Sequence, residues 1–136
     1  MKIFVDTAPF IYLIENNPTF GVKVKNFLID SLKHGYSLET SVITLMEFGV
    51  KPAKEGKLDV IIKFEELLEK LNIEITEVDK EVAQEAYKLR AKYEFLKGMD
   101  AMQLGAAIKN KCLNFLTNDK KLKKITEINI TLISDL

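Results

Sequence analysis

Short apolar segments alternate along the chain with longer segments whose apolar residues recur every three or four positions. The short segments, at 2–5, 36–40, 73–78, 112–116 and 128–133, predict strands. The longer ones predict helices at 9–15, 22–32, 44–50, 58–71, 80–90 and 101–111. Strands that alternate with helices indicate βαβ units. We therefore expect an α/β fold, a single three-layer α/β/α domain over residues 1–136 with a mainly parallel sheet of four or five strands.

Four acidic residues share one kind of position, where a predicted strand gives way to a helix: Asp6, Glu47, Asp100 and Asp119. In a parallel sheet these positions meet in the crevice beyond the carboxyl ends of the strands. Carboxylates crowded together repel, and some must take up protons unless a cation joins them. Mg²⁺ and Mn²⁺ are the natural partners of all-oxygen ligand sets. The pattern therefore predicts a metal-dependent enzyme.

Helix capping is the simpler explanation for each acid taken alone. Asp is a preferred N-cap, so Asp6 and Asp119 are placed to cap the helix and the turn that follow them. Residues 44–47 match a capping box, and residues 100–103 resemble one. Caps at the carboxyl ends of neighbouring strands also converge, so capping and metal binding do not exclude each other. Four such acids together favour a shared site.

Charge and cysteine content limit the possible partners and the cellular compartment of the protein. Lys and Arg number 20 against 20 Asp and Glu, so no global basic field indicates a nucleic-acid partner. Lys120 and Lys121 follow Asp119 directly; a lysine run is usually a solvated face, but beside a metal site it would also attract phosphates. Cys112 is the only cysteine, so we expect no internal disulfide and a cytoplasmic protein. No signal-peptide segment and no apolar run of membrane-spanning length is present, so we expect no membrane association.

Two further residues are given no chemical role. His34 is the only histidine and precedes Gly35 at a predicted helix end, where a cation suits the helix dipole. Histidine-based ribonuclease chemistry normally needs a partner base, which disfavours His34 as a catalytic residue. Cys112 lies in an apolar strand, and we expect its thiol to be inert.

The segments VDTAPFIYLIE, SVITLMEF, GMDAMQLGAA and FLTNDKKL resemble, in order and spacing, the motifs of the PIN domain, and the nearest subgroup is the VapC-type ribonuclease toxins. The resemblance covers essentially the whole chain. It implies cleavage of single-stranded RNA with Mg²⁺ or Mn²⁺, leaving a 5′-phosphate and a 3′-hydroxyl. It also implies that the catalytic residues and metal ligands are Asp6, Glu47, Asp100 and Asp119.

The acids are expected to divide the work. Asp6, Glu47 and Asp100 would hold the main ion, and Asp119 a water or a second ion. Small polar residues nearby suit the orientation of carboxylates, water or substrate: Thr7, Thr117, Asn118 and Gln103, with Lys120 and Lys121 toward the phosphates. A simpler, purely structural role for Gln103 is to cap the helix at Asp100. Leu122 stands near a position where the family often has an aromatic residue.

The resemblance further implies the toxin half of a toxin–antitoxin pair, with an antitoxin segment covering the acidic site. The apolar segment 10–32 is the expected surface for that partner or for a homodimer. Two alternatives stay open: a stand-alone PIN nuclease in RNA processing, and a non-catalytic binding domain of the same fold. A phosphotransfer fold is disfavoured, because Ala8 stands where an aspartyl phosphatase has a second Asp, and Asp6 lacks the paired acid of a receiver domain.

Overall fold

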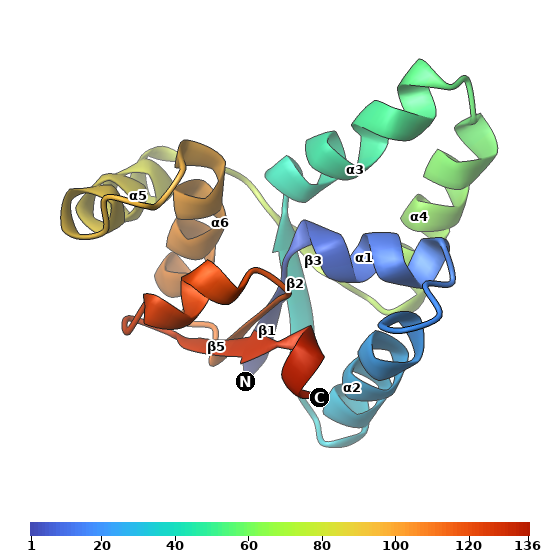
Figure 1. Cartoon of the computed structure of the whole chain (residues 1–136), viewed down its shortest axis with the longest axis horizontal. Helices are drawn as coiled ribbons and strands as arrows, with labels where there is room; N and C mark the ends of the chain where they lie inside the picture. Colours follow the sequence, from blue (N-terminus) through green and yellow to red (C-terminus); the bar gives the residue numbers. More distant parts are fainter.

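A computed structural model describes all 136 residues and shows a five-stranded sheet between two layers of helices (Figure 1). The strand order is β3-β2-β1-β4-β5, and every neighbouring pair is parallel. The strands are β1 (Lys2–Val5), β2 (Ser37–Ser41), β3 (Glu74–Thr76), β4 (Asn114–Thr117) and β5 (Asn129–Leu132). The predicted α/β class and the three-layer arrangement are confirmed.

All six predicted helices are present, with two short 3-10 turns near the end of the chain. They are α1 (Thr7–Ile14), α2 (Gly21–Lys33), α3 (Val42–Lys54), α4 (Leu58–Lys70), α5 (Lys80–Lys92), α6 (Gly98–Lys109), η1 (Lys120–Lys124) and η2 (Ile133–Asp135). The prediction placed α3 at 44–50, which is too short. The helix begins earlier because Ser41 is its N-cap, accepting from the N–H of Ile43, and it continues through Pro52 in its last turn.

Each face of the sheet has its own apolar core, which explains why the central strand β1 reads as a continuous apolar run. On β1, Ile3 and Val5 point to the face covered by α1, α2 and α4, whereas Phe4 points to the face covered by α5 and α6. Phe4 stacks on Phe115 of β4 with ring centroids 5.2 Å apart. Burial on both faces fixes the register of the central strands.

Helices α5 and α6 pack unusually close together. A Cβ on Gly105 of α6 would lie 2.8 Å from the carbonyl oxygen of Val82 and 3.2 Å from the backbone nitrogen of Ala86, both on α5. A side chain at this position would force the two helices apart. The close pair covers one face of the sheet as a unit (Figure 1).

The strand order reverses direction between β1 and β4. From β1 the chain adds β2 and β3 on one side, and later β4 and β5 on the other. The crevice beyond the carboxyl ends of strands at such a reversal is the usual ligand site of an open α/β sheet. No helix has both the length and the apolar character needed to cross a membrane.

Candidate active site

The four acids reach the carboxyl end of the sheet by different routes. Asp6 directly follows β1, Asp119 follows β4, and Glu47 lies in the second turn of α3 after β2. Asp100 lies in the first turn of α6, and α5 precedes that helix. The prediction that each acid follows a strand is therefore wrong for Asp100. Because α6 leads into the amino end of β4, its first turn still lies toward the carboxyl ends of the strands.

Asp6 is only partly exposed and lies near Glu47 and Asp100. Burial raises the pKa of Asp6 to about 6. Hydrogen bonds from the backbone N–H of Thr7 and the hydroxyl of Thr117 act in the opposite direction, and the negative charges of Asp100 and Glu47 add to the rise. The carboxyl group therefore takes up a proton at a higher pH than an ordinary aspartate.

Asp100 links the remaining acids to Asp6. Burial raises the pKa of Asp100, and the charges of Asp119 and Glu47 raise it further, while Lys97 lowers it. The four acids thus form one electrostatic group in which each member is close enough to affect another. None of the seven ion pairs in the structure includes any of them.

The acids are neighbours without forming a closed ligand cage. No group of three or more Asp, Glu, His or Cys side chains is placed to hold one ion together. The chemistry of the donor set nevertheless suits a hard divalent cation, because every donor is a carboxylate oxygen and no lysine or arginine neutralises it. Closing the set around an ion requires side-chain rotation.

Two of the four acids cap a helix with a side-chain hydrogen bond, and the other two do not. Asp6 accepts from the first N–H of α1 at 2.8 Å, and Asp119 accepts from the N–H of Lys121 at 3.0 Å. Glu47 caps nothing, since Ser41 holds that position on α3, and the predicted capping box at 44–47 does not form. Asp100 makes no side-chain cap at the start of α6. Glu47 and Asp100 therefore have no role in helix termination.

A buried polar network lies beneath the acids and centres on Gln103. Its Nε2 donates to Thr44 Oγ1 at 2.7 Å and contacts Asp6 Oδ1 at 3.5 Å, while Ser41 Oγ donates to its Oε1. The simpler prediction, that Gln103 caps the helix at Asp100, is wrong, because its amide is fully used by these partners. The network joins α6 to the end of β2 and to Asp6.

Two threonines orient the carboxylates directly. Thr7 Oγ1 donates to Glu47 Oε1 at 2.6 Å, and Thr117 Oγ1 donates to Asp6 Oδ2 at 2.8 Å. These bonds hold one oxygen of each carboxylate at a fixed place. The structure thus places Thr7 and Thr117 beside the acids, as the sequence indicated.

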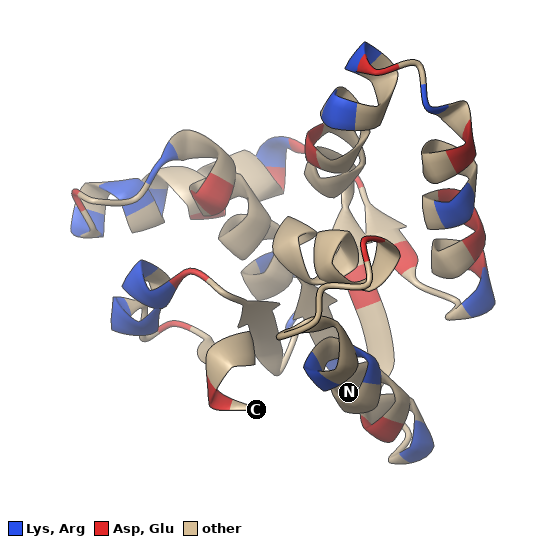
Figure 2. Ribbon diagram, turned by 45° about the vertical axis from the view of Figure 1, so that its right-hand side comes forward, with Lys and Arg blue, Asp and Glu red and all other residues tan.

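The turn after β4 carries the remaining predicted residues. Asn118 Nδ2 donates to the hydroxyl of Tyr12 at 3.1 Å, and the buried Oδ1 of Asn118 has no partner. Asp119 caps η1, and Lys120 and Lys121 are exposed on that turn, which Figure 2 shows as a block of basic residues. Neither lysine takes part in an ion pair.

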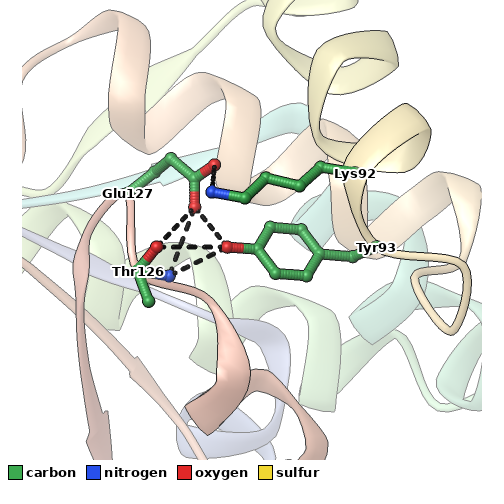
Figure 3. Close-up of polar contacts among 4 residues, drawn as sticks. All are labelled: Lys92, Tyr93, Thr126 and Glu127. Carbon is green, nitrogen blue, oxygen red and sulfur yellow. Dashed lines mark hydrogen bonds and ion pairs between the residues drawn. The ribbon is translucent and has the colours of Figure 1, made fainter.

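A surface cluster ties this turn to the segment that leads into α6 (Figure 3). The hydroxyl of Tyr93 donates to Glu127 Oε1 at 2.6 Å and lies 3.2 Å from the hydroxyl of Thr126. Lys92 Nζ contacts Glu127 Oε2 at 3.3 Å. The cluster thus joins the end of α5 to the segment between η1 and β5.

Some polar residues escaped the sequence reasoning. Ser41 belongs to the buried network, and Thr40 Oγ1 donates to the carbonyl of Val5 at 2.8 Å and lies 2.9 Å from the hydroxyl oxygen of Thr44. Glu39 is completely buried in β2. The signal that could have found them is the polar run 39–41 inside a strand, where apolar residues are expected.

His34 and Cys112 lie away from the acids. His34 precedes β2, near the amino ends of the strands, and its Nδ1 is 2.7 Å from the carbonyl oxygen of Asp30. The Cys112 thiol is buried and donates to Glu39 Oε2 at 3.4 Å. Burial and the charge of Glu39 raise the pKa of Cys112, so the thiol stays protonated at neutral pH.

Comparison with known proteins agrees with this geometry. The family model for the PIN domain matches residues 3–128. The fold is similar to VapBC2 from Rickettsia felis, solved with a DNA fragment of its promoter (TM-score 0.82, 21% identity, 97% of this chain and 98% of that one). It is also similar to DNA-bound VapBC from Salmonella typhimurium (TM-score 0.77, 21% identity, 98% of each chain).

A third similar structure is VapC20 from Mycobacterium tuberculosis, described as a toxin that cleaves the sarcin–ricin loop (TM-score 0.68, 15% identity, 93% of this chain and 98% of that one). No curated protein matches the sequence. The family model covers nearly the whole chain and confirms the resemblance seen in the motifs. The chain belongs to the PIN domain family.

Proposed function

We propose that the chain is a divalent-metal-dependent endoribonuclease that cleaves single-stranded RNA. The observation that carries this proposal is the acidic group at the carboxyl end of the sheet: burial and neighbouring negative charges raise the pKa of Asp6 and Asp100, and none of the four acids forms an ion pair. Perturbed titratable groups gathered in a crevice are typical of functional sites. Membership of the PIN domain family supports the same proposal. The position of the acids supports it too, because ligands of open α/β sheets usually bind at this crevice.

The residues that would hold Mg²⁺ or Mn²⁺ are Asp6, Glu47 and Asp100, with Asp119 for a water or a second ion. A bound ion would lower the pKa of a water molecule and neutralise charge on the reacting phosphate. The protein supplies orientation: Thr7 and Thr117 fix one oxygen of Glu47 and Asp6. Both oxygens of Asp6 accept hydrogen bonds, so a ligand would use their remaining lone pairs together with Glu47 Oε2 and the Asp100 carboxylate.

Cations beside the acids would position the RNA backbone. Lys97 is close enough to lower the pKa of Asp100, and Lys120 and Lys121 are exposed on η1 next to Asp119. These lysines would contact phosphates as point charges, which position a strand without reading its sequence. The acids would therefore lie between Lys97 on one side and Lys120 and Lys121 on the other, along the path of the RNA strand.

Cleavage assays test the nuclease proposal. We expect the protein to cut single-stranded RNA with Mn²⁺ or Mg²⁺, to spare a duplex of the same sequence, and to stop when the metal is chelated. The His34→Ala variant should keep full activity, because the proposed chemistry needs no histidine. Cleavage that persists in the chelator and fails in His34→Ala would replace this mechanism with a metal-free one.

We further propose that the chain is the toxin of a toxin–antitoxin pair. Several solved structures of this fold are described as VapBC or toxin–antitoxin complexes. A groove of about 450 Å³ between α1, α3 and α4 offers a place for an antitoxin segment, with Ile11, Ile14 and Val60 on its walls and Glu47 at its lining. A basic side chain from that segment would pair with the carboxylates.

Growth measurements separate the toxin from its alternatives. Expression alone should slow growth, and Asp100→Asn at the same protein level should restore it. Equal growth with both proteins would favour a stand-alone nuclease in RNA processing if cleavage is retained, or a non-catalytic binding domain if it is not. The helices α1 and α2 also remain our proposed surface for a homodimer, which light scattering would detect as a doubled mass.

A further inference from the structure

A second groove lies on the other side of Glu47, between the start of α3 and the start of α6, with a volume of about 960 Å³. Three of the four methionines of the chain line it: Met46, Met99 and Met102. Met46 and Met99 are 48% and 50% exposed, so about half of each side chain faces solvent in this groove. Exposed apolar groups gathered in a concave surface indicate a binding site.

The methionine groove is continuous with the acidic group. Glu47 and Asp100 line the groove as well as belonging to the four acids, and Lys97 lies on the same wall. A ligand with a phosphodiester at the acids would therefore place its adjoining unit in the groove. That unit must present an apolar face to the methionines and an anionic group toward Lys97.

We propose that the methionine groove binds a nucleobase of single-stranded RNA, from the nucleotide adjoining the phosphodiester held at the acids. This inference rests on the proposed nuclease function. A nucleobase offers a flat apolar face, and the polarisable sulfur of methionine makes favourable contacts with aromatic rings. The adjoining phosphate provides the negative charge for Lys97. Flexible methionines adapt to rings of different size, so this subsite should accept several bases.

The charges around the groove favour a nucleobase over a second copy of the chain. In a two-fold dimer the same patch meets itself, so Glu47 and Asp100 would approach their own copies across the interface. Neither carboxylate forms an ion pair, and the groove lining has two carboxylates against one cation, Lys97, so repulsion between the copies would remain. A neutral nucleobase adds no charge to the site. The strand must be single, because the bases of a duplex stay stacked inside it and cannot enter the groove.

Methionine methyl NMR tests the inference directly. The full chain is labelled with ¹³C at the methionine methyl groups and kept with Ca²⁺, an oxygen-binding cation that offsets the charge of the acids, and the RNA is shown to be intact after each titration. A single-stranded hexanucleotide should shift the resonances of Met46, Met99 and Met102. Met1, which lines a different pocket beside Cys112, is the internal control and should not move. A hexanucleotide with abasic sites in place of bases should leave all four in place and bind roughly tenfold more weakly.

A matched pair of variants provides the kinetic test. The double variant Met46→Gln with Met99→Gln keeps side-chain length and charge but weakens apolar contact with a base. Ile62→Gln on α4 is the control, because Ile62 is 53% exposed and lies outside the groove. With Mn²⁺ present, the double variant should raise KM about tenfold while changing kcat less, and the control should match wild type. Cleavage of an RNA that is abasic beside the scissile bond should not distinguish the three proteins.

Three results would overturn the inference, and each has a distinct signature. RNA that is bound and cleaved without shifting the groove methionines would remove the subsite and leave the nuclease intact. Groove resonances that shift with protein concentration alone, with a doubled mass by light scattering, would assign the groove to a second copy. A chain that neither binds nor cleaves any RNA would defeat the inference together with the proposed function.

Discussion

Acidic residues occur at both ends of the sheet, and the fold treats them in opposite ways. Toward the amino ends of the strands, Glu39 is completely buried, but Lys2 Nζ lies 3.6 Å from its Oε1. The side chains of Asn110 and Cys112 both donate to its Oε2. At the carboxyl ends the larger acidic group has no cationic partner: Asp6, Glu47, Asp100 and Asp119.

This difference separates structural acids from those kept for a ligand. A buried charge that serves the fold must be compensated by the fold itself, as Glu39 is. Burial and neighbouring negative charges raise the pKa of Asp6 and Asp100, so their charged forms lower stability, and we propose that a bound cation compensates them. The four predictions that follow test this contrast, from the largest expected effect to the smallest.

Catalysis should depend on the acidic group at the carboxyl end of the sheet and should not depend on Glu39. Asp100→Asn removes a proposed metal ligand and should lower the rate of RNA cleavage at least about a hundredfold. Glu39→Gln is the matched control, a carboxylate-to-amide change in a buried acid, and should stay within about threefold of wild type. Comparable losses in the two variants, with both proteins folded by circular dichroism, would mean that the contrast between the clusters is not functional.

Stability should depend on pH through Asp6. The pKa of Asp6 is about 6 in the fold and 3.8 for an unperturbed aspartate, so the folded state holds the proton more tightly than the unfolded chain. The carboxylate therefore destabilises the fold as pH rises from about 4 to about 6, and the loss persists above that range. With metal removed by a chelator, the free energy of unfolding of Asp6→Asn, measured in urea, should exceed that of wild type by about 2 to 3 kcal/mol at pH 8. Near pH 4 the two free energies should be nearly equal.

A second N-cap aspartate provides the control for this prediction. Asp79 caps α5 and pairs with Lys109, and the hydrogen bond from Lys109 lowers the pKa of Asp79. A lowered pKa contributes stability above the unfolded value and loses it as pH falls, so Asp79→Asn should lower stability at neutral pH and not in acid. If Asp6→Asn showed that same trend, capping rather than repulsion would dominate at Asp6.

Added metal should relieve the repulsion. Mn²⁺ at about ten times its Kd should stabilise the wild type by about 1.4 kcal/mol, because the ion binds the folded chain and not the unfolded one. This corresponds to a rise in Tm of about 3 to 6 °C, measured by calorimetry. Asp6→Asn should reduce the rise, while Glu39→Gln should keep it. An equal rise in all three proteins would place the ion elsewhere.

The sequence indicates the strands and helices well because both faces of this sheet are buried. It is less informative where two polar residues compete for one role. Ser41 and Thr44 are both suitable N-caps; Ser41 caps α3, and both side chains hydrogen-bond Gln103, which is 59 positions beyond Thr44. The place of Asp100 depends on how α6 returns to β4. Such choices are made by tertiary contacts, which local patterns do not contain.

The smallest effect should come from the ion pair that compensates Glu39. Burial alone would lower the pKa of Lys2, but the carboxylates of Glu39 and Glu74 raise it, so the ammonium is held in place by charge. Lys2→Met leaves Glu39 Oε1, which has no hydrogen-bond partner, without its cation, and should cost about 1 kcal/mol.

The exposed pair Lys88–Glu85 is the control for this prediction, because its N–O distance is also 3.6 Å and both residues lie on α5. Lys88→Met should change stability by less than about 0.5 kcal/mol, the usual contribution of an exposed pair. Adding Glu39→Gln to Lys2→Met should recover most of the loss, since no buried charge then remains. A loss that persists in the double variant would show that Lys2 acts through packing of its aliphatic chain, and that Glu39 does not need its cation.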